Sequence, residues 1–188
     1  MDLGPLNRHL RILAGFVCAI SVYAQAPPTA PAPRLSLLLF VLDDCPISRR
    51  LAPEFRRICA DYSSRGVACT LVFPDPNTTA TQARDFQKSF SLESIPVQLD
   101  PKHKLVRQAG ATITPEAAVF DAKSKLLYLG RLDDSHPSWT QSRPATRHDL
   151  RDALDAALAG RPVPQPRTKA VGCYISPLPN ESTKDSTR

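Results

Sequence analysis

Cys45 lies at the junction between an apolar run and a helical pattern, where a thiol can become a nucleophile. Residues 35–42 have the length and composition of a buried strand, and Pro46 suits the first turn of the helix that follows. The unpaired N–H groups and the positive dipole end of a helix N-terminus favour thiolate over thiol. Arg49 and Arg50 are expected to favour it too, and the two preceding aspartates to oppose it. The pattern predicts a redox cysteine, with a small apolar cap or a static disulfide as the alternative.

Apolar runs and amphipathic patterns alternate around Cys45. Residues 46–65 have helical spacing that ends at Gly66, and Pro53 predicts a kink or a break after the first turn or two. Further strands are predicted at 67–73, 95–99, 116–121 and 126–132, and further helices at 79–90, 102–109 and between 146 and 160. This order predicts an α/β fold of three layers, with a mixed central sheet and helices on both faces.

The N-terminal segment is typical of an export signal. Arg8 and Arg11 precede an uncharged apolar stretch, 12–24, that is too short for a permanent membrane helix, and Ala24 is the expected last residue removed. An uncleaved membrane anchor is the alternative. The predicted organisation is a signal peptide at 1–24, a Pro/Ala linker at 25–34, a domain at 35–160 and a Pro-rich tail at 161–188 that carries Cys173. We therefore expect a periplasmic or extracellular protein that meets a membrane only through its signal peptide.

Composition excludes several other functions. The net charge is +6, but Lys and Arg are dispersed among acids without a basic run, which argues against nucleic acid as a partner. The chain has no CxxCH, P-loop or GxGxxG pattern, so no cofactor is expected. His103, His136 and His148 match no metal-binding spacing and are interpreted as surface residues, so no metal is expected either. We expect a monomer.

Cys59 and Cys69 have the surroundings of core residues. Cys59 belongs to the apolar face of the first predicted helix, and Cys69 alternates with apolar residues in the strand at 67–73. The favoured interpretation is two small core side chains. A bridge between them is the main alternative, since an exported protein meets an oxidising compartment.

Three segments of the chain carry a resemblance to a known family. The run 37–41 leads into Asp44-Cys45-Pro46-Ile47-Ser48, 110–121 reads GATITPEAAVFD, and 171–175 reads VGCYI. Over roughly 35–175 these motifs resemble the thioredoxin superfamily, and most closely its exported, peroxiredoxin-like redoxin branch, grouped with the AhpC/TSA proteins. The resemblance implies a thioredoxin-like fold and redox activity at a cysteine.

The resemblance assigns roles to individual residues. Cys45 matches the first cysteine of a CxxC motif, which attacks disulfides, and Pro46 and Ser48 complete that motif as CPIS. Thr114 and Pro115 match a dipeptide with a cis proline that faces this cysteine. The cis bond would leave the backbone of Thr114 free to pair with an extended substrate and would keep a metal-binding residue away from the thiol.

Two departures from the family pattern narrow the function. Ser48 replaces the second cysteine, so Cys45 has no neighbouring thiol to resolve a mixed disulfide. The Pro-x-x-x-Thr/Ser-x-x-Cys pattern of peroxiredoxins is absent in either possible register, which disfavours peroxidase activity. Cys173 lies in the small apolar patch 171–175, which would let the tail dock on the domain. We therefore expect Cys173 to pair reversibly with Cys45 as a distal resolving thiol, with a static bridge or two unpaired cysteines as the alternatives.

The function predicted from the sequence is thiol–disulfide exchange with protein or small-molecule thiols and disulfides. Cys45 and Cys173 are the expected catalytic residues, and Pro46, Ser48, Thr114 and Pro115 the expected substrate-binding residues. A peroxiredoxin-like peroxide reductase is the first alternative. A non-catalytic binding module in which Cys45 is held in a structural disulfide is the second.

Overall fold

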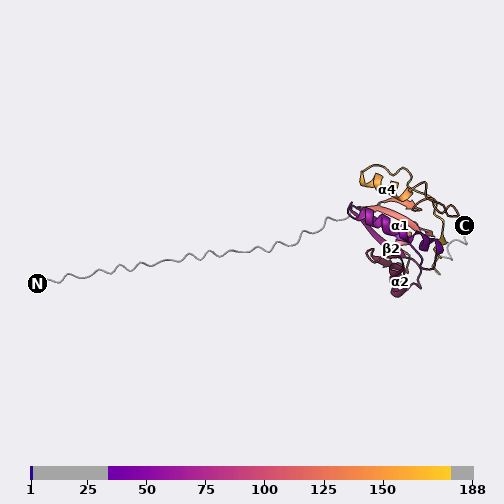
Figure 1. Ribbon diagram of the computed structural model, residues 1–188, viewed down its shortest axis with the longest axis horizontal. Coiled ribbons are helices and arrows are strands. Elements are labelled where there is room, and N and C mark those ends of the chain that lie inside the picture. The colour runs from indigo at the N-terminus through magenta and orange to yellow at the C-terminus, as the bar shows by residue number, and fades with distance from the viewer. Residues whose placement is uncertain (2–33, 179–188) are drawn as a thin grey trace. The chain divides into compact units, whose positions relative to one another are not determined.

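The structure, a computed structural model, describes Met1 and residues 34–178 (Figure 1). In chain order the elements are β1 (Leu35–Phe40), α1 (Pro46–Ser63), β2 (Val67–Phe73), α2 (Ala80–Phe90), β3 (Val97–Leu99), α3 (Lys104–Ala109), β4 (Ile113–Thr114), β5 (Glu116–Asp121), β6 (Leu126–Gly130), α4 (Asp149–Leu158) and β7 (Cys173–Tyr174). The predicted signal peptide, nearly all of the linker and the end of the tail lie outside the described residues. Within the described part of the chain, no helix is both long and apolar enough to span a membrane.

β1 lies in the middle of a five-stranded mixed sheet with the order β3-β2-β1-β5-β6. It pairs in parallel with β2 and antiparallel with β5. Leu37 and Leu39 belong to the core cluster on one face of the sheet, whereas Leu38 and Phe40 contact the cluster on the other face. A strand buried on both faces needs a continuous apolar run, and this is why residues 35–40 show no polar alternation.

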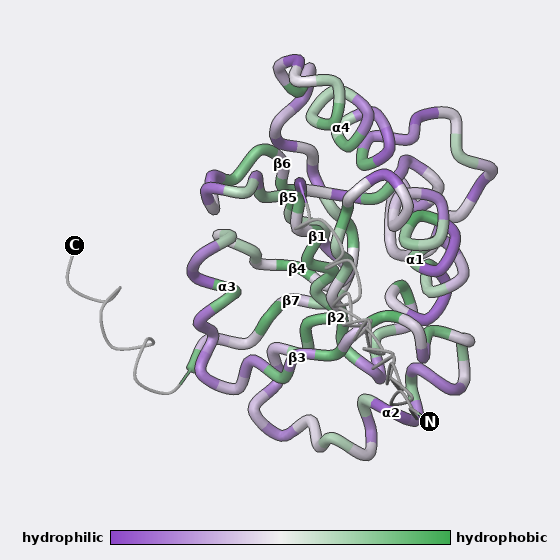
Figure 2. Tube along the Cα trace, turned by 90° about the vertical axis from the view of Figure 1, so that its left-hand side faces the viewer, coloured by the Kyte–Doolittle hydropathy of each residue, from purple (hydrophilic) through white to green (hydrophobic). Residues whose placement is uncertain are grey.

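Helices cover both faces of this sheet. α1, α2 and α4 contribute Phe55, Phe86 and Leu154 to the first core cluster, and α3 contributes Val106 and Ala109 to the second. Figure 2 shows the hydrophobic segments gathered along the strands, with the more polar stretches of the helices outside them. The predicted α/β fold of three layers is confirmed.

α1 continues through Pro53, so the predicted break is wrong. A proline inside a helix removes one backbone hydrogen bond and costs about 3 kcal/mol. Phe55, Ile58 and Tyr62 lie on one face of α1 and are each at most 3% exposed. Their packing against the sheet holds the turns after Pro53 in line and outweighs that cost.

Cys59 of α1 and Cys69 of β2 form a disulfide, with their Cα atoms 5.9 Å apart. The favoured prediction of two separate core cysteines is therefore wrong, and the alternative is correct. The chain turns sharply at Gly66, whose φ is +90°, and this turn places β2 directly beneath the face of α1 that carries Cys59. The bridge fastens α1, whose first residue follows Cys45, to the sheet.

Candidate active site

Cys45 occupies the N-cap position of α1, as the sequence predicts. Its carbonyl oxygen accepts a hydrogen bond from Arg49 N at 3.0 Å, and its Sγ donates to Thr114 O at 3.3 Å. The side chain of Cys45 is 0% exposed. The cis-proline loop and the tail cover the position, so the thiol that the sequence marks as a nucleophile is enclosed.

Thr114 and Pro115 are joined by a cis peptide bond, as the resemblance implies. Both residues are buried, and the carbonyl oxygen of Thr114 accepts the hydrogen bond from Cys45. The loop between β4 and β5 therefore presents a backbone acceptor to the sulfur, and the ring of the proline introduces no group that could bind a metal.

The tail returns to this site as β7, which pairs antiparallel with β4 (Figure 2). In this register Cys173 lies opposite Thr114, and Thr114 Oγ1 donates to Cys173 O at 3.3 Å. Just beyond β7, Ile175 N donates to Thr112 O at 3.0 Å. The backbone of Thr114 is therefore not free to pair with an extended substrate, which differs from the prediction. The chain's own tail occupies that edge.

Gly172 and Ile175 explain why the tail docks here. A Cβ at position 172 would overlap Thr114 O and lie 3.1 Å from Pro115 Cδ, so only glycine permits this close approach. Ile175 packs against the second core cluster, which includes Phe40. The apolar patch at 171–175 signalled this docking, whereas the role of Gly172 was missed; a glycine directly before a tail cysteine is the signal that could have found it.

Cys45 and Cys173 meet at Thr114, because Cys45 Sγ donates to the carbonyl oxygen of Thr114 and Cys173 lies opposite Thr114 in the β4–β7 pair. Burial acts to raise the pKa of Cys45, but hydrogen bonds from the thiol of Cys173 and from Ser48 outweigh it and hold the pKa below its usual value. Burial, together with the hydrogen bond and the charge of Cys45, raises the pKa of Cys173 to about 12. Of the two thiols, Cys45 therefore has the lower pKa and ionises before Cys173.

Ser48 stabilises the thiolate form of Cys45 from the first turn of α1. Its hydroxyl and backbone N–H donate to a thiolate at Cys45, and its Oγ also accepts a hydrogen bond from Leu42 N at 3.5 Å. Ser48 is 0% exposed, so its side chain lies away from the protein surface, and its predicted contact with a substrate stays a prediction. Pro46 is exposed and remains available to a partner.

The prediction that Arg49 and Arg50 lower the pKa of Cys45 is wrong. Arg49 Nη1 donates to Asp43 O at 3.0 Å, and its guanidinium lies 5.1 Å from the centre of the Phe90 ring. Arg49 and Arg50 are exposed, and neither is among the groups that shift the pKa of Cys45. Charges on exposed side chains are screened by water, whereas the donors of Ser48 and Cys173 are in direct contact with the sulfur.

The histidines differ from the prediction at one position. His103 is 3% exposed, because its ring is buried and its Nε2 lies 3.0 Å from Pro74 O. His136 is partly buried and His148 is exposed. Across the described part of the chain, no three His, Cys, Asp or Glu side chains are grouped so that they could hold a metal ion.

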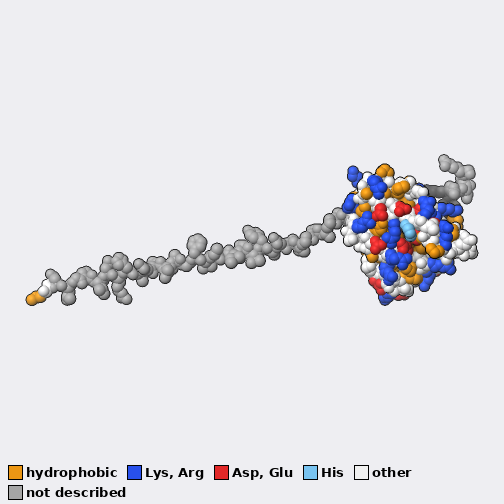
Figure 3. All heavy atoms as spheres, turned by 45° about the horizontal axis from the view of Figure 1, so that its top comes forward, with side chains coloured by type: hydrophobic (Ala, Val, Ile, Leu, Met, Phe, Trp, Pro, Cys, Tyr) orange, Lys and Arg blue, Asp and Glu red, His pale blue; other side chains and the backbone are white. Residues whose placement is uncertain are grey.

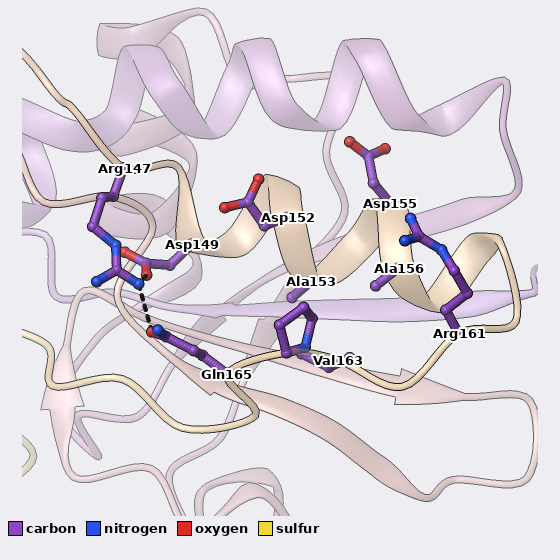
Figure 4. A pocket seen from close by; sticks show the side chains of 10 residues that line it. Arg147, Asp149, Asp152, Ala153, Asp155, Ala156, Arg161, Val163 and Gln165 are labelled. Carbon is purple, nitrogen blue, oxygen red and sulfur yellow. Dashed lines mark hydrogen bonds and ion pairs between the residues drawn. The ribbon is translucent and has the colours of Figure 1, made fainter.

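A cleft of about 400 Å³ lies between the loops that follow β1 and β2 and the segment after β7, and neither Cys45 nor Cys173 lines it. Its lining includes Leu42, Pro74, Asn77, His103, Ile175 and Leu178. A second hollow of about 470 Å³ lies between α4 and residues 161–165 (Figure 4). Neither cysteine lines it, and Arg147 there bonds Gln165 at 2.6 Å and Asp149 at 3.1 Å.

The surface charges are mixed. On the face shown in Figure 3, Lys and Arg side chains lie among Asp and Glu side chains. Among the described residues, ion pairs join Arg151 to Asp61 at 2.7 Å and Arg65 to Asp155 at 2.7 Å. Such a surface offers no continuous basic track for a phosphate backbone on this face.

Comparisons with known proteins support the fold. No protein-family model and no curated protein matches the sequence. Among solved structures, an uncharacterised conserved protein from Geobacillus kaustophilus is 27% identical, with a TM-score of 0.69 and 79% of each chain covered. A candidate thiol:disulfide interchange protein DsbE from Chlorobium tepidum is 24% identical, with a TM-score of 0.52 and 68% of this chain and 82% of that chain covered. A thioredoxin-like protein in its oxidised form is 15% identical, with a TM-score of 0.51 and coverages of 69% and 81%.

The chain therefore has a thioredoxin-like fold. The sheet order, the cis-proline loop and the cysteine at the N-terminus of α1 all agree with this fold. These likenesses establish the fold, and the activity has to be argued from the site itself.

Proposed function

We propose that this protein is an exported thiol–disulfide oxidoreductase in which Cys45 and Cys173 alternate between a dithiol and a disulfide. The observation that carries the proposal is the position of both cysteines at the cis Thr114–Pro115 bond: Cys45 Sγ donates to Thr114 O, and Cys173 lies opposite Thr114 in the β4–β7 pair. The CPIS motif ends in Ser48 and has one sulfur only. Cys173 supplies the second sulfur that a complete exchange cycle requires.

Each residue of the site has a role in this proposal. Cys45 is the stabilised thiolate, because Ser48 and the N-terminus of α1 surround it with N–H and O–H donors. Thr114 and Pro115 align the two sulfurs by binding the thiol of Cys45 and the backbone of β7. Pro46, which is exposed next to the thiol, is the residue proposed to contact a partner.

The reaction is an exchange of two electrons with a thiol or disulfide partner. Formation of the Cys45–Cys173 disulfide releases two electrons and two protons, and a partner disulfide that accepts them becomes a dithiol. The reverse reaction oxidises a partner dithiol. We propose protein or small-molecule thiols as these partners. The signal peptide predicted at 1–24 assigns the reaction to the periplasm or the extracellular space, where disulfides persist.

One observation favours a second candidate function. Cys45 is fully enclosed and β7 fills the edge beside it, which is also what a non-catalytic binding module with a permanent Cys45–Cys173 bridge requires. Such a bridge closes a loop of well over 100 residues and would stabilise the fold by up to about 4–5 kcal/mol. A redox titration separates the two candidates.

The test is to equilibrate the full chain in buffers of reduced and oxidised glutathione and to trap free thiols with N-ethylmaleimide before mass analysis. We expect the Cys45–Cys173 disulfide to form and open reversibly, and the oxidised protein to introduce disulfides into a reduced, unfolded test protein. The substitution Cys45→Ser should abolish this transfer, and the exposed Ser176→Ala should not change it. A bridge that forms but transfers nothing supports the binding module. Two thiols that never join contradict both candidates.

A further inference from the structure

The two sulfurs of the site differ in their access to an outside molecule. Cys45 is 0% exposed and lies between the N-terminus of α1, Thr114 and the tail. Cys173 is partly exposed on β7, and the next side chain, Tyr174, is 79% exposed. A thiolate that attacks a disulfide must reach one of its two sulfur atoms, so exposure decides which sulfur is attacked.

We propose that in the oxidised protein an outside thiol attacks Sγ of Cys173, so that the mixed disulfide forms on the tail and Cys45 is the leaving group. This inference rests on the proposed function. It reverses the roles that the CxxC resemblance implies, in which the cysteine at the start of the helix carries the substrate. β7 stays docked on β4 throughout, and no substrate needs to displace it.

The bonds and electrons balance in two steps. In the first step the outside thiolate forms a bond to Sγ of Cys173, the Cys173–Cys45 bond breaks, and its electron pair stays on Cys45. In the second step another thiolate of the same substrate attacks the substrate sulfur of the mixed disulfide. Cys173 then leaves and takes a proton from water. The substrate has lost two electrons and gained a disulfide, and the protein holds Cys173 as a thiol and Cys45 as a thiolate.

The surroundings of Cys45 suit a leaving group. Exchange is faster when the departing thiol has a low pKa, and the hydroxyl and N–H of Ser48 stabilise the thiolate that departs. Cys173 would be the poorer leaving group, since its own pKa is raised. Access and the stability of the leaving group therefore both favour attack at Sγ of Cys173, with Cys45 as the sulfur that departs. The substrate class that suits this sequence of steps is a dithiol, because its second thiol is held next to the mixed disulfide and releases the product without a further encounter.

The direct test maps the first covalent product. The oxidised full chain is exposed briefly to reduced glutathione, quenched with acid, labelled with N-ethylmaleimide and digested for mass analysis. We expect glutathione on Cys173 and the maleimide on Cys45, in at least about tenfold excess over the opposite arrangement. Glutathione found mainly on Cys45 overturns the inference and leaves the proposed function intact. If the Cys45–Cys173 disulfide does not form at all, the redox titration already contradicts the proposed function.

A second measurement applies if the mixed disulfide decays before quenching. Glutathione is anionic, so a charge beside the attacked sulfur changes the rate at which the disulfide is reduced. We expect Tyr174→Lys to be reduced about three- to tenfold faster than Tyr174→Glu at low salt. Lys123 lies in the turn after β5, at the opposite end of the sheet, so Lys123→Glu gives the matched change of charge and should alter the rate little. Equal rates in the two Tyr174 variants overturn the inference.

Discussion

Gly172 lies directly against the carbonyl oxygen of Thr114, and no side chain fits between them. The same carbonyl oxygen accepts the hydrogen bond from Cys45. One peptide group of the cis-proline loop therefore holds both the nucleophile and the tail. The position of the second sulfur depends on this contact, because Cys173 follows Gly172 immediately.

Replacement of Gly172 should release the tail and open the site. In Gly172→Val the new side chain overlaps Thr114 O, so β7 cannot pair with β4 and Cys45 loses its cover. We expect alkylation of Cys45 in the reduced protein to become at least about tenfold faster, which corresponds to about 1.4 kcal/mol of lost docking free energy. Iodoacetamide labelling followed by mass analysis of the Cys45 peptide measures the rate. Ser176→Val, which is exposed and lies on the same tail, is the control and should label as slowly as the unmodified chain. Equal rates for all three proteins would show that the tail does not guard Cys45.

The thiol of Cys173 should be needed for the low pKa of Cys45. Cys173→Ala removes a donor to the thiolate, and its loss raises the pKa of Cys45. Cys173→Ser keeps a hydroxyl donor in the same place and should restore most of the shift. Thiolate absorbance near 240 nm, followed against pH in the reduced protein, measures this, and the bonded Cys59 and Cys69 do not titrate. Identical titrations for the two variants would contradict the hydrogen bond.

Removal of the second disulfide should affect stability and leave the redox site unchanged. The Cys59–Cys69 bridge closes a short loop, for which the entropy of the unfolded chain predicts a contribution of about 2–3 kcal/mol. We expect the double variant Cys59→Ala with Cys69→Ala to lose about this much free energy of unfolding in urea. The thiolate titration of Cys45 is the control and should stay the same. A variant that keeps its urea midpoint would mean that the bridge adds nothing to the folded state.

Local patterns were sufficient for the framework of the site, and contacts between distant residues determined the rest. The apolar run at 35–42 and Pro46 predict the strand and the helix start from neighbouring residues alone, and the family resemblance implies the cis bond at Thr114–Pro115. The enclosure of Cys45 and the pairing of β4 with β7 depend on where the tail docks. The tail lies more than 100 residues along the chain from Cys45. No periodicity in two-residue strands reveals that pairing.

The same limit explains the disulfide and the role of Ser48. The periodic patterns correctly give the faces that carry Cys59 and Cys69. Whether those faces place two Cα atoms within bonding reach depends on the turn at Gly66 and on the position of α1 along the sheet. Ser48 occupies the second-cysteine position of CxxC, which points to substrate contact. Its burial follows from the packing of the first turn of α1.

The two thiols should give the reduced protein a stability that depends on pH in two separate windows. Cys45 has a pKa below its usual value of 9.0, so its contribution is present above that value and is lost as the pH falls through the lowered pKa. Cys173 has a pKa raised to about 12, so its contribution is complete below pH 9 and is lost progressively as the pH rises toward 12. The oxidised protein has neither dependence, because a disulfide does not titrate.

Urea unfolding at a series of pH values measures both windows, with the oxidised protein as the reference for all other titrating groups. Above pH 9 we expect the reduced protein to lose stability relative to the oxidised one, and reduced Cys173→Ala to lose less, since it has no thiol there to ionise on unfolding. On the acid side, reduced Cys45→Ala should lack the decline that the unmodified chain shows. Parallel curves for the reduced and oxidised proteins over the whole range would mean that neither sulfur differs from a cysteine in the unfolded chain, and the charge on Cys45 that drives the exchange would be absent.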